Sequence, residues 1–462
     1  MADSIIKTSK TPASPGQKRP PGPHEHWLLG SAHHIQSDPI GFNMSMMQRY
    51  GDVVSIRFLF WPTYIIFHPN DVKHVLQENH RNYNKDTYLM KFLKPLLGQG
   101  LLTNDGQSWL HQRRLMQPAF HRKQLAAFGS LMTTATVDMQ ERWQSFVRDD
   151  QSVDIAVEMM RLTLRIVGQA LFSIDLSNEA STVGQAFATI RTLLTDYIFN
   201  PFPPLTIPTP RNRRIQRAIR TLDMVVRDII TEHRQQYSEK GDLLSMLLQA
   251  RDEETGEEMS DQQLRDEVMT LLLAGHETTA NALTWTWYLL AQYPEVERRL
   301  HAELEQVLGG QLPTVEHLPE LSYTHMVLEE ALRLYPPAFG FNRKAIADDE
   351  IGGYVVPANT LIWISPYSTH RHPDFWENPE VFDPERFSPE RSAGRPHFAY
   401  FPFGGGPRLC IGNNFAMMEA QLILATLAQR YRLRLVPGHK VEPEVLLSIR
   451  PRNGLSMTLH ER

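Results

Sequence analysis

The segment FPFGGGPRLCIG, Phe401 to Gly412, decides how this chain is interpreted. It holds the single cysteine of the 462-residue chain, Cys410, shortly after three consecutive glycines and a proline. Such a run forces a tight, irregular backbone, because glycine reaches conformations closed to other residues. A helical pattern from Phe415 to Tyr431 begins just after the cysteine. We therefore expect Cys410 at a helix N-terminus, where unpaired N–H groups and the helix dipole favour a thiolate.

Three roles for this cysteine remain open from these residues alone. It could be a buried structural residue, a nucleophile served by a histidine base as in a cysteine hydrolase, or a thiolate ligand of a metal. A phosphate-binding loop is excluded, because no Lys-Ser or Lys-Thr follows Gly406. A single cysteine also excludes a disulfide framework within the chain and any multi-cysteine zinc or iron–sulfur site.

The composition is that of an ordinary globular protein, with 42% hydrophobic, 21% charged and 9% aromatic residues. These proportions exclude disordered and fibrous classes. A formal net charge of −5 gives no reason to expect nucleic-acid binding. The Pro-rich start of the chain has no apolar stretch of signal-peptide length, so residues 1–26 are predicted to form a flexible lead without a membrane anchor. We expect a cytoplasmic protein.

The most apolar window, Val268 to Ala291, belongs to a long predicted helix. Ser260-Asp261-Gln262-Gln263 has the form of a capping box, and the helical pattern lasts from there until just before Pro294. That is about 33 residues or ~50 Å, enough to cross the whole molecule. Polar residues at the middle of the window disfavour a transmembrane position and favour a helix buried in a soluble core.

The rest of the chain is mostly helical by periodicity, with a small β region. The prolines of 201–210 lie in a predicted apolar loop, and Arg251 to Met259 is expected to be a solvated connection. No linker separates independent cores, so one mainly α (α+β) domain is predicted over residues 27–462. Its expected elements are a helix near Pro39–Tyr50, a hairpin of Val54–Phe60 and Tyr64–Phe67 turning at Trp61–Thr63, a helix near Ser322–Leu334, and strands at Tyr354–Ile364 and near the C-terminus.

The spacing Phe403-x-x-Gly406-x-Arg408-x-Cys410-x-Gly412 resembles the haem-binding signature of the cytochrome P-450 family. The resemblance implies that Cys410 is the thiolate ligand of haem b (iron protoporphyrin IX). A thiolate ligand favours O–O bond cleavage. By the same resemblance, Phe403 would shield the sulfur and Arg408 would pair with a haem propionate.

The long helix carries Ala274-Gly275-His276-Glu277-Thr278-Thr279, which resembles the family's distal-helix motif. Ala274 and Gly275 would leave space for a planar cofactor and dioxygen, and Glu277 and Thr278 would relay protons to reduced dioxygen. The alternative is that Thr278 bonds to a helix carbonyl and Glu277 faces only water. We expect His276 to be packed or at the haem edge rather than an iron ligand.

Two further segments resemble the family. Glu330-x-x-Arg333 places both side chains on one helix face. The resemblance implies a buried structural pair completed by Arg386, although such spacing usually marks a surface ion pair. Trp109-x-x-x-Arg113 resembles the helix that passes a haem propionate. Arg343 stands where many family members carry another propionate-binding arginine, with an ordinary surface residue as the alternative.

The resemblance spans Trp109 to Gly412 and implies a helical triangular prism with a small β region. It implies a monooxygenase that inserts one atom of O2 into a hydrophobic substrate, using electrons from a separate ferredoxin or flavodoxin and its reductase. A peroxide-driven peroxygenase of the same fold and a non-enzymatic haem sensor are the alternatives. We expect a monomer.

Apolar segments are expected to line the substrate pocket, which favours a fatty acid, terpenoid, steroid or similar molecule. No lone cation commits that pocket to a carboxylate. The basic residues around Arg113 could form a docking face for an acidic electron donor, and the Arg-rich run 211–220 is a rival patch that is more often a solvated helix. The pocket segments are Tyr88–Met90, Phe92–Leu93, Tyr197–Phe199 with Phe202, and Ala338–Phe341; the docking residues are His111, Arg113, Arg114, His121, Arg122 and Lys123.

Overall fold

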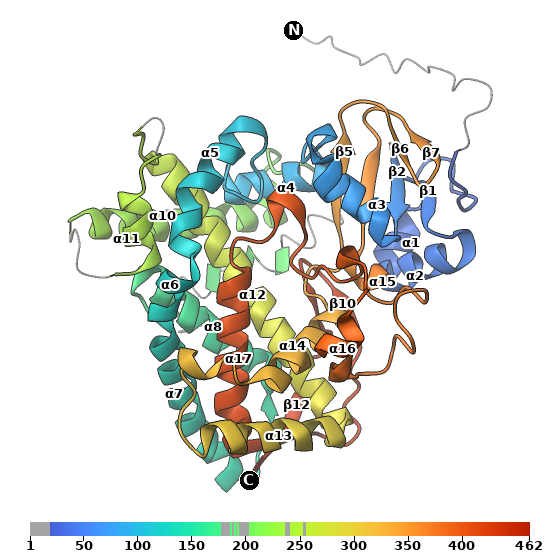
Figure 1. Cartoon of the computed structure of the whole chain (residues 1–462). Coiled ribbons are helices and arrows are strands. Elements are labelled where there is room, and N and C mark those ends of the chain that lie inside the picture. The colour runs from blue at the N-terminus through green and yellow to red at the C-terminus, as the bar shows by residue number, and fades with distance from the viewer. Residues whose placement is uncertain are drawn as a thin grey trace.

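The computed structural model describes residues 19–176, 185–186, 189–190, 192–193, 203–235, 241–252 and 256–462. Helices fill one side of the molecule and its narrow base, and the largest sheet stands at the opposite upper side (Figure 1). Among the described helices, none combines the length and the apolar character needed to cross a bilayer.

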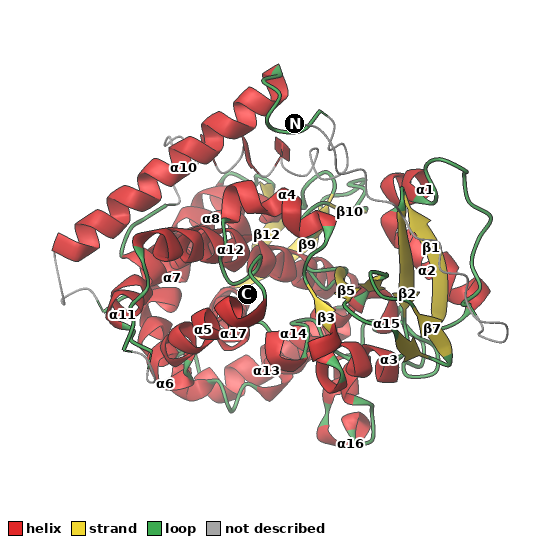
Figure 2. Ribbon diagram, turned by 90° about the horizontal axis from the view of Figure 1, so that it is seen from above, coloured by secondary structure: helices red, strands yellow, loops and turns green. Residues whose placement is uncertain are grey.

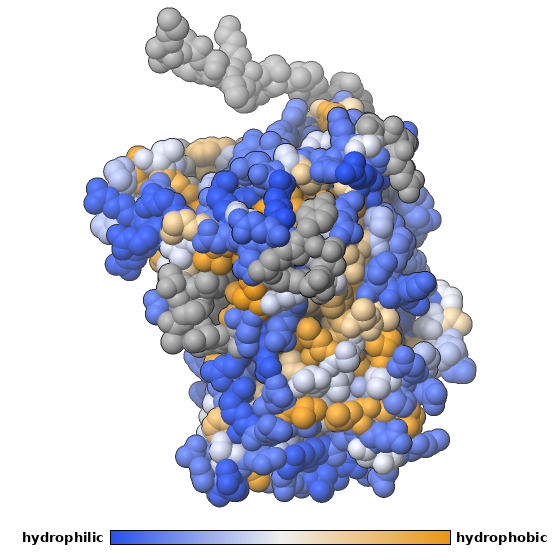
Figure 3. Space-filling view, turned by 90° about the vertical axis from the view of Figure 1, so that its left-hand side faces the viewer, coloured by the Kyte–Doolittle hydropathy of each residue, from blue (hydrophilic) through white to orange (hydrophobic). Residues whose placement is uncertain are grey.

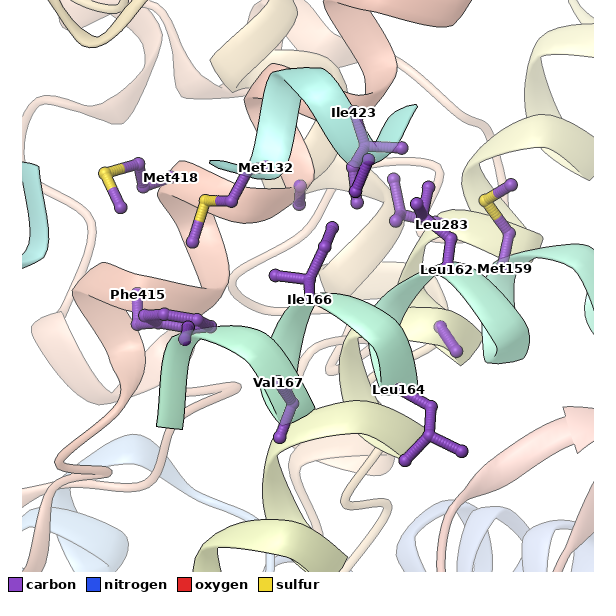
Figure 4. Close-up of a cluster of buried hydrophobic side chains, with 14 of the residues drawn as sticks. Met132, Met159, Leu162, Leu164, Ile166, Val167, Leu283, Phe415, Met418 and Ile423 are labelled. Atoms are coloured by element: carbon purple, nitrogen blue, oxygen red, sulfur yellow. The ribbon is translucent and has the colours of Figure 1, made fainter. Parts of the chain in front are cut away.

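The long helix α12 (Asp261–Gln292) runs through the middle of the helical part. The Ser260 hydroxyl accepts from the Gln263 N–H, and the Gln263 side chain accepts from the Ser260 N–H, so the predicted capping box and helix are confirmed. Helices α8 (Ile155–Phe172) and α17 (Asn413–Arg430) pack against it, and α7 (Gly129–Arg148) packs against both of them. Their apolar side chains form one core, in which Met132, Ile166, Leu283 and Ile423 come from four different helices (Figure 4).

The remaining helices surround this core. The predicted helices at Pro39–Tyr50 and Ser322–Leu334 are confirmed with those bounds. These two helices are α2 (Pro39–Tyr50) and α14 (Ser322–Leu334). The other surrounding helices are α1 (Ala32–Ser37), α3 (Pro69–Lys73), α4 (Tyr88–Leu97), α5 (Gly106–Met116), α6 (Arg122–Leu125), α10 (Pro210–Gln235), α11 (Leu243–Gln249), α13 (Pro294–Leu308), α15 (Pro366–Thr369) and α16 (Pro389–Ser392).

Helix α10 lies along the outside of the helical part, far from β1 and β2 (Figure 2). Four of its arginines, Arg213, Arg214, Arg217 and Arg220, are exposed. The side of the molecule that carries α10 and α11 is largely hydrophilic, with apolar patches between (Figure 3). The Arg-rich run is therefore a solvated helix face.

The main sheet has the strand order β1-β2-β8-β5-β3, with β2 and β8 parallel and the other pairs antiparallel. A three-stranded sheet has the order β4-β12-β9, and β6-β7 and β10-β11 are hairpins. Strands of the first third thus pair with strands of the last third. The bounds are β1 (Val53–Phe58), β2 (Trp61–Ile66), β3 (Tyr83–Asn84), β4 (Val153–Asp154), β5 (Phe341–Ala345), β6 (Asp349–Ile351), β7 (Tyr354–Val356), β8 (Leu361–Ile364), β9 (Tyr431–Leu435), β10 (Pro443–Val445), β11 (Ile449–Pro451) and β12 (Ser456–Glu461).

The predicted turn of the first hairpin, at Trp61–Thr63, is wrong. The chain turns at Leu59 and Phe60, where Leu59 has φ of 53°, and Pro62 pairs with Arg57 inside the ladder. A proline is tolerated there because β2 begins to pair with β8 only at Thr63. The missing N–H of Pro62 is therefore not needed on the β8 side.

The end of the predicted flexible lead is packed on β1. The Ser55 N–H donates to the Pro21 carbonyl at 2.8 Å, and the Arg57 N–H donates to the Glu25 carboxylate. Gly22 lies so close that a Cβ there would come within 1.9 Å of the Ser55 carbonyl oxygen. The segment Pro21 to His26 is thus part of the fold rather than a flexible lead.

Candidate active site

A cavity of about 570 Å³ lies between α4, α12 and the loop that carries Cys410. Most of the residues that line the cavity are aliphatic or aromatic, among them Leu93, Leu271 and Phe339. All nine residues that the sequence singled out for chemistry or cofactor binding line this cavity: Trp109, Arg113, Ala274, Glu277, Thr278, Arg343, Phe403, Arg408 and Cys410.

The backbone conformation of the cysteine loop requires a glycine at Gly406, the third of its three consecutive glycines. Gly406 has φ of +66°, and a Cβ on it would lie 1.8 Å from the Leu76 carbonyl oxygen. Only glycine fits such a position. The Cys410 N–H donates to the Phe403 carbonyl at 3.0 Å, which closes the loop, and the Cys410 side chain is exposed towards the cavity.

The environment of Cys410 does not favour the thiolate on balance, contrary to the sequence expectation. Its position deep in the protein raises the pKa of the thiol, while the Gly412 N–H and the Arg113 guanidinium lower it in part. A bound metal cation would supply the missing stabilisation of the thiolate.

Arg408 lies against the face of Trp109, with the guanidinium carbon 3.9 Å from the ring centroid. Its Nη1 donates to the Asn104 carbonyl at 3.0 Å, and its Nη2 forms an ion pair with Asp105. Arg113 is one helical turn from Trp109 and donates from Nη1 to the Leu409 carbonyl at 3.0 Å. Both guanidinium groups thus lie beside the cysteine loop, at the edge of the cavity.

Arg343 and Lys85 complete a cluster of four cations at this edge, called here the cation cluster: Lys85, Arg113, Arg343 and Arg408. Burial and the nearby Arg408 lower the pKa of Arg343 to about 10, so Arg343 is not an ordinary surface residue. Burial, Arg343 and Arg408 hold the pKa of Lys85 well below its ordinary value, and its Nζ donates to the Leu102 carbonyl at 2.9 Å.

Lys85 was missed by sequence reasoning, which identified no lone cation at the pocket. No motif includes it; its position just before the predicted pocket segment Tyr88–Met90 was the only available signal. Within the described residues, Asp105 is the carboxylate that raises the pKa of Lys85 and Arg343. One carboxylate cannot balance four cations. An anionic cofactor with carboxylate groups therefore fits this edge of the cavity.

The α12 wall of the cavity is open at Ala274, which is exposed towards it. Gly275 has a different reason to be small: a Cβ there would approach a Val167 methyl group of α8 to 3.3 Å. The glycine therefore serves the close packing of α12 on α8, not only the space for a cofactor. His276 is buried, contacts the Leu272 carbonyl through Nδ1 and does not line the cavity.

Glu277 is held by the loop between β10 and β11. The Ser448 hydroxyl donates to its Oε1 at 2.6 Å, and the Asn281 side-chain amide donates to the Ser448 hydroxyl at 2.7 Å. The alternative that Glu277 faces only water is therefore wrong. The Thr278 hydroxyl donates to the Ala274 carbonyl at 2.8 Å, as the packing alternative proposed, but its oxygen can still accept a hydrogen bond from a group in the cavity.

A buried network fixes the segment that leads to the cysteine loop. Both side-chain oxygens of Glu330 accept from Arg333, each at 2.7 Å, and Arg386 Nε lies 3.3 Å from Oε1. Arg333 also donates to the His370 carbonyl at 2.9 Å, and the His370 ring accepts from the Phe401 N–H at 2.9 Å. The network therefore reaches the first residue of the cysteine loop.

The predicted pocket segments mostly line the cavity. Phe92 is the exception, because it contacts the edge of the Tyr88 ring instead. Tyr197, Ile198, Phe199 and Phe202 lie outside the described residues. Tyr88 stacks on both Phe58 and Trp61, at centroid distances of 4.9 and 5.4 Å. The lining segments are Tyr88–Met90, Leu93 and Ala338–Phe341.

Comparison with known proteins agrees with this geometry. The cytochrome P450 family model matches residues 20–457. The chain is 38% identical to cyclooctatin synthase of Streptomyces melanosporofaciens, covering 96% of each chain, and 36% identical to pentalenene oxygenase of Streptomyces avermitilis, covering 94% of this chain and 96% of the relative. The crystal structure of the cytochrome P450DA heme domain is similar with a TM-score of 0.89 at 28% identity, covering 96% of this chain and 98% of that one.

Proposed function

Because the chain belongs to the cytochrome P450 family and is a haem monooxygenase, we propose that it oxidises a terpenoid, using electrons from a separate carrier protein. The observation that carries this proposal is the cavity itself. Cys410 faces it at one side, and the wall beyond the cation cluster is almost entirely apolar. A polycyclic or branched hydrocarbon skeleton suits such a wall better than a charged molecule.

The names of relatives support the substrate class. One relative of Streptomyces melanosporofaciens, 38% identical to this chain, is cyclooctat-9-en-7-ol 5-monooxygenase, and another relative is pentalenene oxygenase. We extend from them to this chain only the class of substrate, a terpenoid hydrocarbon or alcohol. Fatty acids and steroids are the competing classes for an apolar cavity of this size.

Named residues would hold the haem. Cys410 would ligate the iron and Phe403 would cover the sulfur, while the cation cluster and the Trp109 indole would bind the propionates. Once bound, the haem supplies the activation of dioxygen that the side chains of this chain cannot provide. Ala274 leaves room on the α12 side, and the apolar wall excludes water from the substrate.

Glu277 and Thr278 would accept and donate protons on the α12 side of the cavity. The Glu277 carboxyl group is fixed by Ser448, so it stays in one orientation at the cavity wall. The Thr278 oxygen can accept a hydrogen bond from a water or an oxygen species in the cavity and can donate in turn when its bond to Ala274 is exchanged.

The electron donor would dock on the side of the cysteine loop. His121, Arg122 and Lys123, at the start of α6, are exposed, and α6 packs against α17. Of the other predicted docking residues, His111 and Arg114 face the buried Asp252, and Arg113 lines the cavity. The exposed basic group suits an acidic ferredoxin or flavodoxin.

An absorption spectrum of the reduced, carbon-monoxide-bound protein tests the haem–thiolate assignment. We expect the red-shifted Soret band of a thiolate ligand, and Cys410→Ala should remove it. The substrate class is tested by titrating terpene alcohols, fatty acids and steroids and recording the low-spin to high-spin shift. Tighter binding of a fatty acid or a steroid than of every terpenoid tested would overturn the terpenoid proposal.

Docking is tested by charge reversal. Arg122→Glu with Lys123→Glu should slow electron transfer from a [2Fe–2S] ferredoxin at low salt, and the difference from the parent should shrink at high salt. Arg213→Glu with Arg214→Glu on α10 is the matched control, because it changes the net charge equally on a remote face. Equal slowing by both pairs would exclude a specific docking role for α6.

A further inference from the structure

We propose that Asp266 and Glu267 of α12 are positioning residues for substrate selection, because they hold the loop after α4 so that Leu101 keeps one place against the substrate. This loop, residues 98–104, is called here the α4–α5 loop. The inference rests on the proposed function, since it concerns how the same cavity selects its substrate. Leu101 and Leu102 of the α4–α5 loop line the cavity, whereas neither Asp266 nor Glu267 does.

Two backbone N–H groups of the α4–α5 loop donate to these carboxyl groups. The Gln99 N–H donates to Asp266 Oδ2 at 2.7 Å, and the Leu101 N–H donates to Glu267 Oε2 at 2.9 Å. The second bond is made to the main chain of the very residue whose side chain lines the cavity. It therefore fixes the backbone from which the Leu101 side chain projects.

Glu267 has no other role that its contacts explain. Its side chain is fully buried, its Oε1 has no hydrogen-bond partner, and within the described part of the chain it forms no ion pair. The preceding residues differ, because Arg265 bonds to Asp266 and pairs with Asp223 of α10. A buried carboxyl group costs free energy unless it is hydrogen-bonded. The bond from the Leu101 N–H is therefore the contact that accounts for a carboxyl group at this position.

Two glycines allow the α4–α5 loop to approach α12 closely. A Cβ on Gly98 would lie 2.2 Å from the Asp266 carboxyl carbon, and a Cβ on Gly100 would lie 2.2 Å from the Thr270 hydroxyl oxygen. Gly98 has a φ of +55°, which itself favours glycine. Gly100 is not among the glycines with positive φ. Close contact with α12 is therefore the reason for a glycine at position 100.

Helix α5 holds the α4–α5 loop on either side of Leu101. The Gln112 side-chain amide donates to the Gln99 carbonyl at 3.0 Å, and its Oε1 accepts from the Asn104 side chain at 2.6 Å. Leu101 lies between these two attachments and is held by Glu267. Loss of the Glu267 acceptor should therefore free the centre of the loop while its ends stay in place.

Substrate binding to the haem-loaded protein tests this role at about pH 7. Burial raises the pKa of Glu267 to about 8, so the group is mostly protonated at this pH and glutamine is its closest substitute. Glu267→Gln keeps an oxygen that can accept the Leu101 N–H, whereas Glu267→Leu does not. The probes are farnesol and cedrol, a linear and a tricyclic terpene alcohol of equal carbon number. For the probe that the parent binds more tightly, we expect roughly 10-fold weaker binding by Glu267→Leu and nearly unchanged binding by Glu267→Gln.

A double-mutant cycle tests whether Glu267 acts through Leu101. In a Leu101→Ala background, Glu267→Leu should change the dissociation constant of the probe by no more than about 2-fold. Gly100→Ala perturbs the same contact without removing a carboxyl group, because its Cβ would meet the Thr270 side chain. It should reproduce the loss seen in Glu267→Leu, and it provides the same test if Glu267→Leu does not fold. Fully additive losses with Leu101→Ala would overturn the proposal.

Glu297→Leu is the matched control for general loosening of the fold. Glu297 lies in α13, is 4% exposed and pairs with Arg434. Its replacement should lower the melting temperature without changing the affinity for the probe. An equal loss of affinity in Glu297→Leu and Glu267→Leu would overturn the positioning role. A parent that binds neither terpenoid but binds a fatty acid or a steroid would instead refute the substrate class of the proposed function, and the cycle would then be measured with that ligand.

Discussion

Replacing Glu330 with alanine tests how firmly the cysteine loop is held. Besides Arg333, the Glu330 carboxylate accepts the Asp383 N–H at 3.0 Å and faces Arg386. Arg333 is fully buried and Arg386 nearly so. The substitution leaves two guanidinium groups without their anion. Breaking a buried ion pair in this way costs ~3–5 kcal/mol.

The structure indicates the lower end of that range. Arg333 keeps three carbonyl partners, those of His370, Pro379 and Val381, at 2.8 to 3.2 Å. We therefore expect a loss of about 3 kcal/mol from a folding free energy of roughly 5–15 kcal/mol. Because Arg333 holds the backbone of His370, whose ring binds the Phe401 N–H, the loss should also loosen the cysteine loop.

The assay measures thermal unfolding and the rate of haem transfer to apomyoglobin. Glu330→Ala should unfold at lower temperature and release haem faster than the parent. Glu442→Ala is the matched control, since the Glu442–Arg452 pair is about half exposed, at 54% and 53%, and contributes at most ~1 kcal/mol. If both variants unfold and release haem alike, the reasoning about the buried network is refuted.

Three more predictions follow from single side chains. Thr278→Ala should keep the haem spectrum but waste more reduced cofactor as hydrogen peroxide, typically with a 10²-fold or smaller loss of product formation, and Thr278→Ser should recover coupling. Lys85→Ala should release haem faster in the same transfer assay, while Lys91→Ala, at an exposed ion pair, should not. Burial raises the pKa of Glu267 to about 8 from an ordinary 4.5. The stability that its protonation provides is therefore lost as the pH rises between these values. Glu267→Gln should flatten the pH dependence of thermal unfolding over this range.

The parts of the fold that the sequence predicted correctly have local causes. Helix α12 begins at a side-chain cap that four consecutive residues form among themselves, and it ends just before Pro294. Helix α14 likewise ends before two prolines. Caps and prolines act within one helical turn, so their effect is visible in the sequence alone.

The parts that the sequence did not predict depend on contacts between distant segments. The hairpin turns at Leu59 and Phe60 rather than at the predicted Trp61–Thr63, because pairing with β8, some 300 residues away, decides where Pro62 is tolerated. The packing role of Gly275 depends on Val167 of α8. The bond from Ser448 to Glu277 links α12 to a loop near the C-terminus. No local pattern reports such contacts.

The candidate site also divides into features that local motifs predict and features that only the folded structure shows. Motifs identify the chemical groups of the site but not the free energy needed to bring those groups together. The motifs identified the residues that would touch a haem, and the structure brings those residues to one cavity. The motifs could not show that the electrostatics of the site are unfavourable when the protein side chains are considered alone. Four cations share one edge, where Arg343 and Arg408 lower the pKa of Lys85 and Arg408 lowers the pKa of Arg343, and burial raises the pKa of the Cys410 thiol. A group that carries a metal cation and two carboxylates relieves both penalties, so its binding free energy adds directly to the stability of the fold.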